Sequence, residues 1–188
     1  MDKHPHFFGY GSLVNRDTHD FTPVQRSRIA GWRRVWHRAP VRPAAFLSVV
    51  RDPDATIDGV IAPVPNDDWH ALDTREYAYD RVIVTEAVTH AAKDVRDISI
   101  YAIPPHESAP PDEDHPILLS YVDAVIQGYL REFGEGSATQ FMHNTEGWST
   151  SVRNDRDAPI YPRAQVLSAL ERDFVDDMLV SVGAKVKI

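Results

Sequence analysis

The chain contains no cysteine among its 188 residues. This absence excludes a disulfide framework, a zinc site built on thiolates and a cysteine nucleophile. Long hydrophobic runs are also missing, since no apolar segment approaches the ~20 residues that a membrane-spanning helix needs. The polar residues 1–6 lack the hydrophobic stretch of a signal peptide. We therefore expect a cytoplasmic protein with no membrane partner.

Positive charge is in deficit, because 28 Asp and Glu outnumber 20 Lys and Arg and give a formal net charge of −8. Such a chain has little general affinity for nucleic acids, and we expect no nucleic-acid partner. Residues 21–51 are the exception, because they contain no acid and seven arginines. We favour a strand whose arginines pair with acids elsewhere in the chain. A nucleic-acid surface, or a positive field that attracts a small anion, are the alternatives. Arg34 is therefore kept as a candidate substrate contact.

The chain has the composition of an ordinary globular protein, with 43% hydrophobic and 26% charged residues. We expect a single domain over residues 1–188, with a sheet-rich part (1–103), a proline-rich loop (104–116) and a helical part (117–188). Alternation of apolar residues predicts strands at 6–8, 29–37, 45–51, 56–64, 79–89 and 97–103. Asp52-Pro53-Asp54 predicts a turn between two of them. One helix is expected from an N-cap at Asn66 to Arg75 or Glu76.

The C-terminal part has helical spacing of its apolar residues. One helix is expected over residues 118–133, with Pro116 in its first turn and Gly134 as its stop. A second is expected over 163–181, with a buried stripe and Gly183 as its end. That stripe comprises Val166, Leu167, Leu170, Phe174 and Met178. Residues 144–162, which include Trp148 and Tyr161, form either a lid or a plain connection. Strands followed by helices predict an α+β fold, with helices packed on a mainly antiparallel, bent and barrel-like sheet.

The turn predicted after the first strand carries two glycines, in the sequence Phe8-Gly9-Tyr10-Gly11-Ser12-Leu13. Glycine allows unusual backbone conformations and lets a ligand approach closely. Successive backbone N–H groups in such a turn form a concavity that binds anions. A simple tight turn after an edge strand is the alternative.

Three known motifs do not fit these residues. A dinucleotide fingerprint needs a glycine where Val14 stands, and a P-loop needs a lysine directly after the glycines. A nucleophile elbow around Ser12 needs glycines where Tyr10 and Val14 stand. We therefore predict a carboxylate-binding turn rather than a phosphate loop or a serine hydrolase. Histidines are scattered, and although His4 and His6 alternate on one strand, we expect no metal site.

Two blocks of sequence carry a family resemblance. Residues 8–13 resemble the Tyr-Gly-Ser-Leu signature of the γ-glutamylcyclotransferase-like superfamily, which includes ChaC-type and AIG2-like proteins. Residues 72–82, LDTREYAYDRV, resemble the Leu-Asp-x-x-Glu segment of that family and the Tyr-x-Arg-Val that follows it. The second block is closer to the AIG2-like pattern than to the ChaC type, which leaves the substrate branch open.

The resemblance implies a small α+β domain with a bent, barrel-like sheet that converts γ-glutamyl compounds to 5-oxoproline and releases the amine. It assigns Glu76 the acid/base role and the backbone of Tyr10, Gly11, Ser12 and Leu13 the binding of the glutamyl head. Glutathione, γ-glutamyl amino acids and γ-glutamyl-amines are the candidate donors, and no cofactor is implied. Tyr79 is either a pocket residue or a core residue, and Tyr161 is a further candidate contact.

Without the family resemblance, the sequence leaves alternative interpretations open. On the residues alone, Glu76 is also compatible with a surface carboxylate at a helix end, paired with Arg75 or Arg81. An amide hydrolase at the same site, or a non-catalytic protein that binds small anions, are the competing functions. The oligomeric state is either monomer or homodimer.

Overall fold

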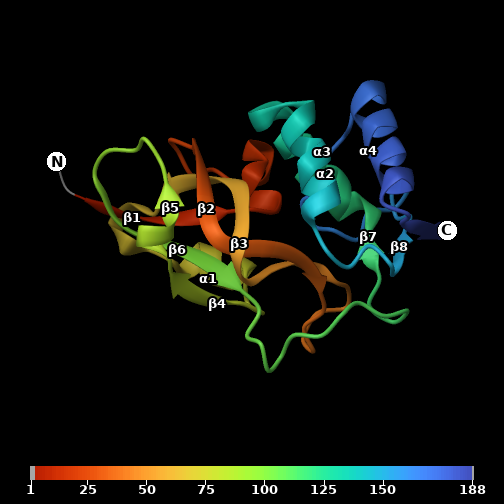
Figure 1. The fold of residues 1–188 in the computed structure, drawn as a ribbon, viewed down its shortest axis with the longest axis horizontal. Coiled ribbons are helices and arrows are strands. Elements are labelled where there is room, and N and C mark those ends of the chain that lie inside the picture. Colours follow the sequence, from red (N-terminus) through yellow and green to blue (C-terminus); the bar gives the residue numbers. More distant parts are fainter. Residues whose placement is uncertain (1–2, 188) are drawn as a thin grey trace.

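The main sheet has six strands in the order β4-β6-β1-β3-β2-β5 and curls into a half-barrel (Figure 1). The structure is a computed structural model in which residues 3–187 are described. The strands are β1 (His4–Gly9), β2 (Gln25–His37), β3 (Phe46–Pro63), β4 (Asp80–Ile83), β5 (Val88–Thr89) and β6 (Val95–Ala102). All neighbours in this sheet are antiparallel except β1 and β6, which are parallel. The predicted α+β class with a mainly antiparallel, bent sheet is confirmed.

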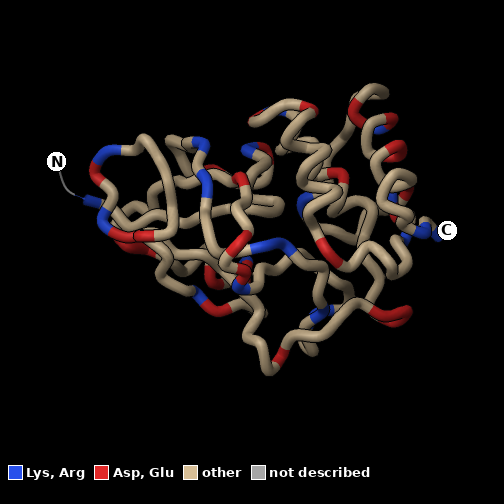
Figure 2. The backbone as a smooth tube through the Cα atoms, viewed as in Figure 1, with Lys and Arg blue, Asp and Glu red and all other residues tan. Residues whose placement is uncertain are grey.

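β2 shows why the arginine-rich segment folds as a strand. Its side chains alternate, so that Arg26 and Arg28 face outward while Ile29 and Trp32 are buried. Several of its arginines meet acids from other segments, as Arg28 does with Asp58 at 2.6 Å. Figure 2 shows acidic and basic residues interspersed along the backbone. The favoured interpretation of residues 21–51 is therefore confirmed for most of these arginines.

β3 corrects the prediction of two strands joined by a turn. The pairs Ala30–Thr56 and Trp32–Arg51 leave residues 52–55 of β3 opposite Gly31 alone. Gly31 has a φ of +79°, which a glycine adopts without a steric penalty. Pro53 lacks an N–H and falls in this unpaired stretch, so it interrupts no hydrogen bond. The turn residues thus form a bulge within one long strand.

The helix α1 (His70–Arg75) begins later than expected. Asn66 and Asp67 have φ values of 57° and 59°, which no α-helix accommodates. They belong to a 3₁₀ turn, Pro65–Asp67, that precedes the helix. The strand expected over 79–89 is likewise divided into β4 and β5 by a 3₁₀ turn at Thr85–Ala87.

Three helices, α2 (Leu119–Phe133), α3 (Glu135–Asn144) and α4 (Ala169–Ser181), lie together beyond one end of the sheet (Figure 1). Gly134 ends α2 with a φ of +83°, as predicted. Pro116 does not lie in that helix, because β7 (Ile117–Leu118) comes between them. β7 pairs in parallel with β8 (Ser151–Arg153), and β8 with β9 (Lys185–Lys187). Neither α3 nor this small sheet was predicted.

α4 also differs from its prediction. It begins after Ser168, whose side chain forms a capping box with Glu171, rather than at residue 163. Of the predicted stripe, Leu167, Phe174 and Met178 pack against the core, whereas Val166 and Leu170 are exposed. Val175 and Leu179, which were not part of the predicted stripe, are buried. One hydrophobic cluster contains residues of the sheet and of α2. No helix within residues 3–187 is long and apolar enough to cross a bilayer.

Candidate active site

The glycine turn leaves three backbone donors free at the end of β1. Residues Ser12–Val14 form a 3₁₀ turn, in which the N–H of Val14 donates to the carbonyl of Gly11 at 3.0 Å. Within the described residues, the N–H groups of Gly11, Ser12 and Leu13 have no hydrogen-bond acceptor. A group that binds there would supply the acceptors that buried backbone donors normally require.

Close packing, not backbone conformation, explains both glycines of the turn. Neither has a positive φ. A Cβ on Gly9 would lie 2.7 Å from the Cβ of Leu13, and one on Gly11 would lie 3.0 Å from the Tyr121 hydroxyl. These glycines are therefore required by the close approach of the protein's own side chains and not by a positive φ.

A hollow opens beside this turn. Its lining comes from the turn, from β3, from the α1–β4 corner, from β6 and from α2. The lining residues are Phe8, Gly9, Tyr10, Gly11, Ser12, Leu13, Leu47, Glu76, Tyr79, Tyr101 and Tyr121. The structure thus brings Glu76 and Tyr79 to the residues 10–13.

Glu76 lies directly after α1, where its N–H donates to the carbonyl of Leu72 at 2.8 Å. Only 17% of its side chain is exposed, and its carboxylate lies 3.2 Å from the guanidinium of Arg75. Burial raises the pKa of Glu76, and the positive charges of Arg75, Arg42 and Arg163 only partly oppose this. Glu76 is therefore a largely buried carboxyl group that is easier to protonate than a surface glutamate.

Arg75 connects Glu76 to the glycine turn. Its Nη2 donates to the hydroxyl of Ser12 at 3.0 Å, and its Nη1 donates to the carbonyl of Thr18 at 2.8 Å. Its side chain is only 6% exposed. Glu76 does pair with Arg75, as the alternative interpretation of the sequence proposed. The pair is largely buried beside the hollow, however, and does not lie on the surface. Arg81 pairs instead with Asp73, at 3.2 Å.

The tyrosines of the hollow are fixed by hydrogen bonds to the backbone. Tyr10 donates to the carbonyl of Tyr101 at 2.6 Å, and Tyr79 donates to that of Leu47 at 2.7 Å. Tyr79 is therefore both partly buried and a lining residue. Tyr161 lines an adjoining hollow together with Glu76.

Arg34 is not brought to this site. Its Nη2 donates to the hydroxyl of Tyr129 at 2.9 Å and to the carbonyl of Asp58 at 2.8 Å. It lines a separate hollow beside Phe141 of α3. Its relation to residues 10–13 is indirect, through Tyr129, whose hydroxyl also donates to the carbonyl of Tyr10.

The sequence analysis missed Tyr121, Arg42 and Arg163 as lining residues. Tyr121 comes from the first turn of α2, and its ring packs against Phe46 at 4.9 Å between centroids. Its helical position alone indicates a core residue. Arg42 was noted only as one of many arginines, and Arg163 was expected in a helix. No local signal separates these residues from ordinary surface and core positions.

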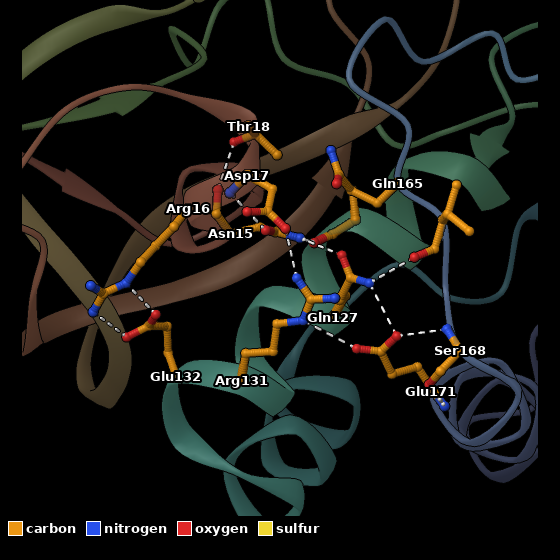
Figure 3. Close-up of polar contacts among 12 residues, drawn as sticks. Asn15, Arg16, Asp17, Thr18, Gln127, Arg131, Glu132, Gln165, Ser168 and Glu171 are labelled. Atoms are coloured by element: carbon orange, nitrogen blue, oxygen red, sulfur yellow. Dashed lines mark hydrogen bonds and ion pairs between the residues drawn. The ribbon is translucent and has the colours of Figure 1, made fainter.

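The loop after the turn is anchored to α2 and α4, as Figure 3 shows. Asn15 donates to the side chain of Gln127 at 3.0 Å, and Gln127 donates to Glu171 at 3.1 Å (Figure 3). Arg16 forms a two-point ion pair with Glu132, with distances of 2.5 and 2.8 Å. Glu132 is buried while the Arg16 side chain is about half-exposed, and the two parallel hydrogen bonds fix the orientation of the pair. Both helices therefore hold the residues that follow the anion-binding turn.

Comparisons with known proteins identify the fold. No family model and no curated protein sequence matches this chain. Among solved structures, a γ-glutamyl cyclotransferase matches with a TM-score of 0.53 and 14% identity, over 93% of this chain and 99% of its own. The fold is γ-glutamylcyclotransferase-like. YkqA from Bacillus subtilis has the same fold, with a TM-score of 0.57, 15% identity and 74% of this chain covered.

A further similar structure is that of an uncharacterized human protein, with a TM-score of 0.55 and 14% identity. It is matched over 91% of this chain and 97% of its own. The present chain spans only 53% of YkqA. At these identities the likeness establishes the fold, so the argument for an activity depends on the site itself.

Within residues 3–187, no three His, Asp or Glu side chains gather as ligands for a metal ion. The polar groups that line the hollow are the Glu76 carboxylate, the hydroxyls of serine and tyrosine, and backbone N–H groups.

Proposed function

We propose that this protein converts a γ-glutamyl compound to 5-oxoproline and releases the amine. One observation supports this above all: a buried carboxyl group, Glu76, and the free N–H groups of residues 11–13 line the same hollow. The γ-glutamylcyclotransferase-like fold is consistent with this reaction. A binding protein for small anions would need the N–H groups but not a buried carboxyl group with a raised pKa.

In this proposal the turn holds the glutamyl head. The α-carboxylate of the substrate accepts hydrogen bonds from the N–H groups of Gly11, Ser12 and Leu13. This contact places the α-amine and the γ-carbonyl of the same molecule close together. Such orientation can contribute several kcal/mol to an intramolecular reaction, within the ~7–11 kcal/mol available from effective concentration.

Glu76 moves the proton. The α-amine is mostly protonated in water and is then no nucleophile, so a base has to receive its proton. The amine nitrogen forms a bond to the γ-carbon, and the bond from that carbon to the leaving nitrogen breaks. The attacking nitrogen loses two protons on its way from ammonium to lactam N–H, and both pass in turn through Glu76 to the leaving nitrogen, which departs as an ammonium. No water is consumed and no electrons are transferred to a cofactor. Positioned proton transfer of this kind typically contributes ~10²–10⁴-fold in rate.

The test is direct measurement of products by mass spectrometry. The purified protein is incubated with glutathione, several γ-glutamyl amino acids and several γ-glutamyl-amines. We expect 5-oxoproline and the free amine in equal amounts from at least one donor. Release of glutamate would indicate an amide hydrolase, and absence of any product from all donors would contradict the proposal.

The pH dependence of the reaction reports the environment of Glu76. Burial raises the pKa of this group, and only its ionised form accepts a proton. We therefore expect kcat/KM to fall as the pH decreases through a value above that of an ordinary glutamate, since this profile reflects the free enzyme. Circular dichroism at each pH controls for unfolding. An acid limb at or below the ordinary glutamate pKa would contradict this assignment.

A further inference from the structure

A second hollow adjoins the first at Glu76, and Ser12 of the glycine turn lines both. Three arginines are among the residues that line it. Its lining residues are Ser12, Arg42, Phe46, Arg75, Glu76, Tyr79, Tyr121, Tyr161 and Arg163. Glu76 is the only acid among them. Since Arg75 is paired with Glu76, the other two arginines give this hollow a net positive charge.

Arg42 and Arg163 lack the carboxylate partners that most arginines of this chain have. Among the described residues, no carboxylate oxygen lies within the 4.0 Å of an ion pair from either guanidinium. By contrast, Arg28 pairs with Asp58 and Arg156 pairs with Asp123. Both unpaired arginines nevertheless act electrostatically on Glu76. An anion that enters the hollow could therefore form ion pairs with both arginines.

The guanidinium of Arg42 is held in position before any ligand binds. It lies 4.0 Å from the ring centre of Tyr77 and 5.0 Å from that of Phe46. Its Nη2 donates to the carbonyl of Arg75 at 3.0 Å, while its buried Nε has no hydrogen-bond partner. A stacked guanidinium loses little freedom when it binds a carboxylate, so it is well suited to recognise one.

The two hollows lie next to each other at Glu76. They share Ser12, Glu76, Tyr79 and Tyr121 in their linings. A substrate whose glutamyl head occupies the first hollow has its γ-carbonyl beside Glu76. Its leaving amine then extends into the hollow lined by arginines. In this arrangement the bond that breaks lies between the two hollows, with the glutamyl head in the first and the leaving amine in the second.

We propose that Arg42 and Arg163 bind a carboxylate carried by the leaving amine, so that the enzyme uses γ-glutamyl amino acids or peptides rather than γ-glutamyl-amines. This inference rests on the proposed cyclisation. It specifies the substrate class that the first hollow leaves open, since the N–H turn recognises only the glutamyl head common to all donors.

The experiment compares two donors that differ only in this carboxylate, γ-glutamylglycine and γ-glutamylglycinamide. Initial rates of 5-oxoproline release give kcat/KM for each with the wild-type protein. A charge-assisted hydrogen bond lost with the carboxylate predicts a preference of ~10- to 100-fold for the acid. The substitution Arg163→Gln is expected to reduce this ratio towards one. Arg172→Gln, on the exposed face of α4 and outside both hollows, is the matched control and is expected to keep the wild-type ratio.

The outcomes separate this inference from the proposed function. Equal kcat/KM for the two donors, or an unchanged ratio in Arg163→Gln, would overturn the role of the arginines while the cyclisation stands. Failure of both donors, and of every other γ-glutamyl compound, would overturn both. Because the comparison of donors uses only the wild-type protein, it remains decisive if a variant does not fold.

Discussion

Replacing Glu76 by glutamine is expected to abolish 5-oxoproline release while the protein stays folded. Glutamine has the size of glutamate but accepts no proton at the carboxyl position, so the amine of the substrate stays protonated and the leaving amine receives no proton. The expected loss in kcat is ~10²–10⁴-fold, the usual contribution of positioned acid/base catalysis. Mass spectrometry of 5-oxoproline under saturating donor measures it.

The same variant is expected to be at least as stable as the wild type at neutral pH. Since burial raises the pKa of Glu76, the folded protein binds this proton more tightly than the unfolded chain does. Ionised Glu76 therefore lowers the free energy of unfolding above its folded pKa, and this cost disappears below the unfolded pKa. Uncharged glutamine avoids that cost, so its advantage is present at neutral pH and is lost in acid.

A matched control for Glu76→Gln is Glu135→Gln, in the exposed first turn of α3. That change removes a carboxylate without touching either hollow and is expected to keep full turnover. Full turnover in Glu76→Gln would exclude Glu76 as the acid/base. A loss of activity together with a large drop in melting temperature would indicate a structural role instead.

Replacing Gly128 by alanine is expected to destabilise the protein although it lies inside a helix. A Cβ at this position of α2 would lie 2.7 Å from the backbone nitrogen of Asn15 and 2.8 Å from its Cα. Alanine gains about 1 kcal/mol in helix propensity over glycine. Overpacking against backbone costs ~1–3 kcal/mol and often more, because backbone moves less easily than a side-chain end. We expect a net loss of ~1–2 kcal/mol, measured by urea unfolding.

Gly136→Ala in α3 is the control for this prediction. A Cβ there meets no atom within 4 Å, so only the gain in helix propensity acts. This variant is expected to be more stable, by up to about 1 kcal/mol. Opposite signs for the two substitutions would support the close approach of α2 to the loop after the glycine turn. If both substitutions stabilise the protein, α2 packs less closely against Asn15 than the structure indicates.

Much of the fold was predictable because the signals are local. The first strand and its glycine turn, the end of α2 at Gly134 and the alternation in β2 each depend on residues next to one another in sequence. The start of α4 was also encoded locally, since Ser168 and Glu171 have the spacing of a capping box that the sequence analysis overlooked. The single strand β3 was not predictable in this way. Asp52-Pro53-Asp54 is a turn signal, and only the pairing with β2 makes it a bulge.

By itself, the sequence determined the α+β class, the absence of cysteine chemistry and the positions of the glycine turn and of Glu76, because these follow from composition and short motifs. Only the tertiary structure decided which distant side chains meet. It placed Arg34 behind Tyr129, away from the hollow, and brought Arg42 and Arg163 from separate loops to the side of Glu76. The sequence alone does not distinguish an arginine that is paired with an acid from one that is free. Whether it pairs with an acid or stays free for a ligand depends on packing between segments far apart in the chain.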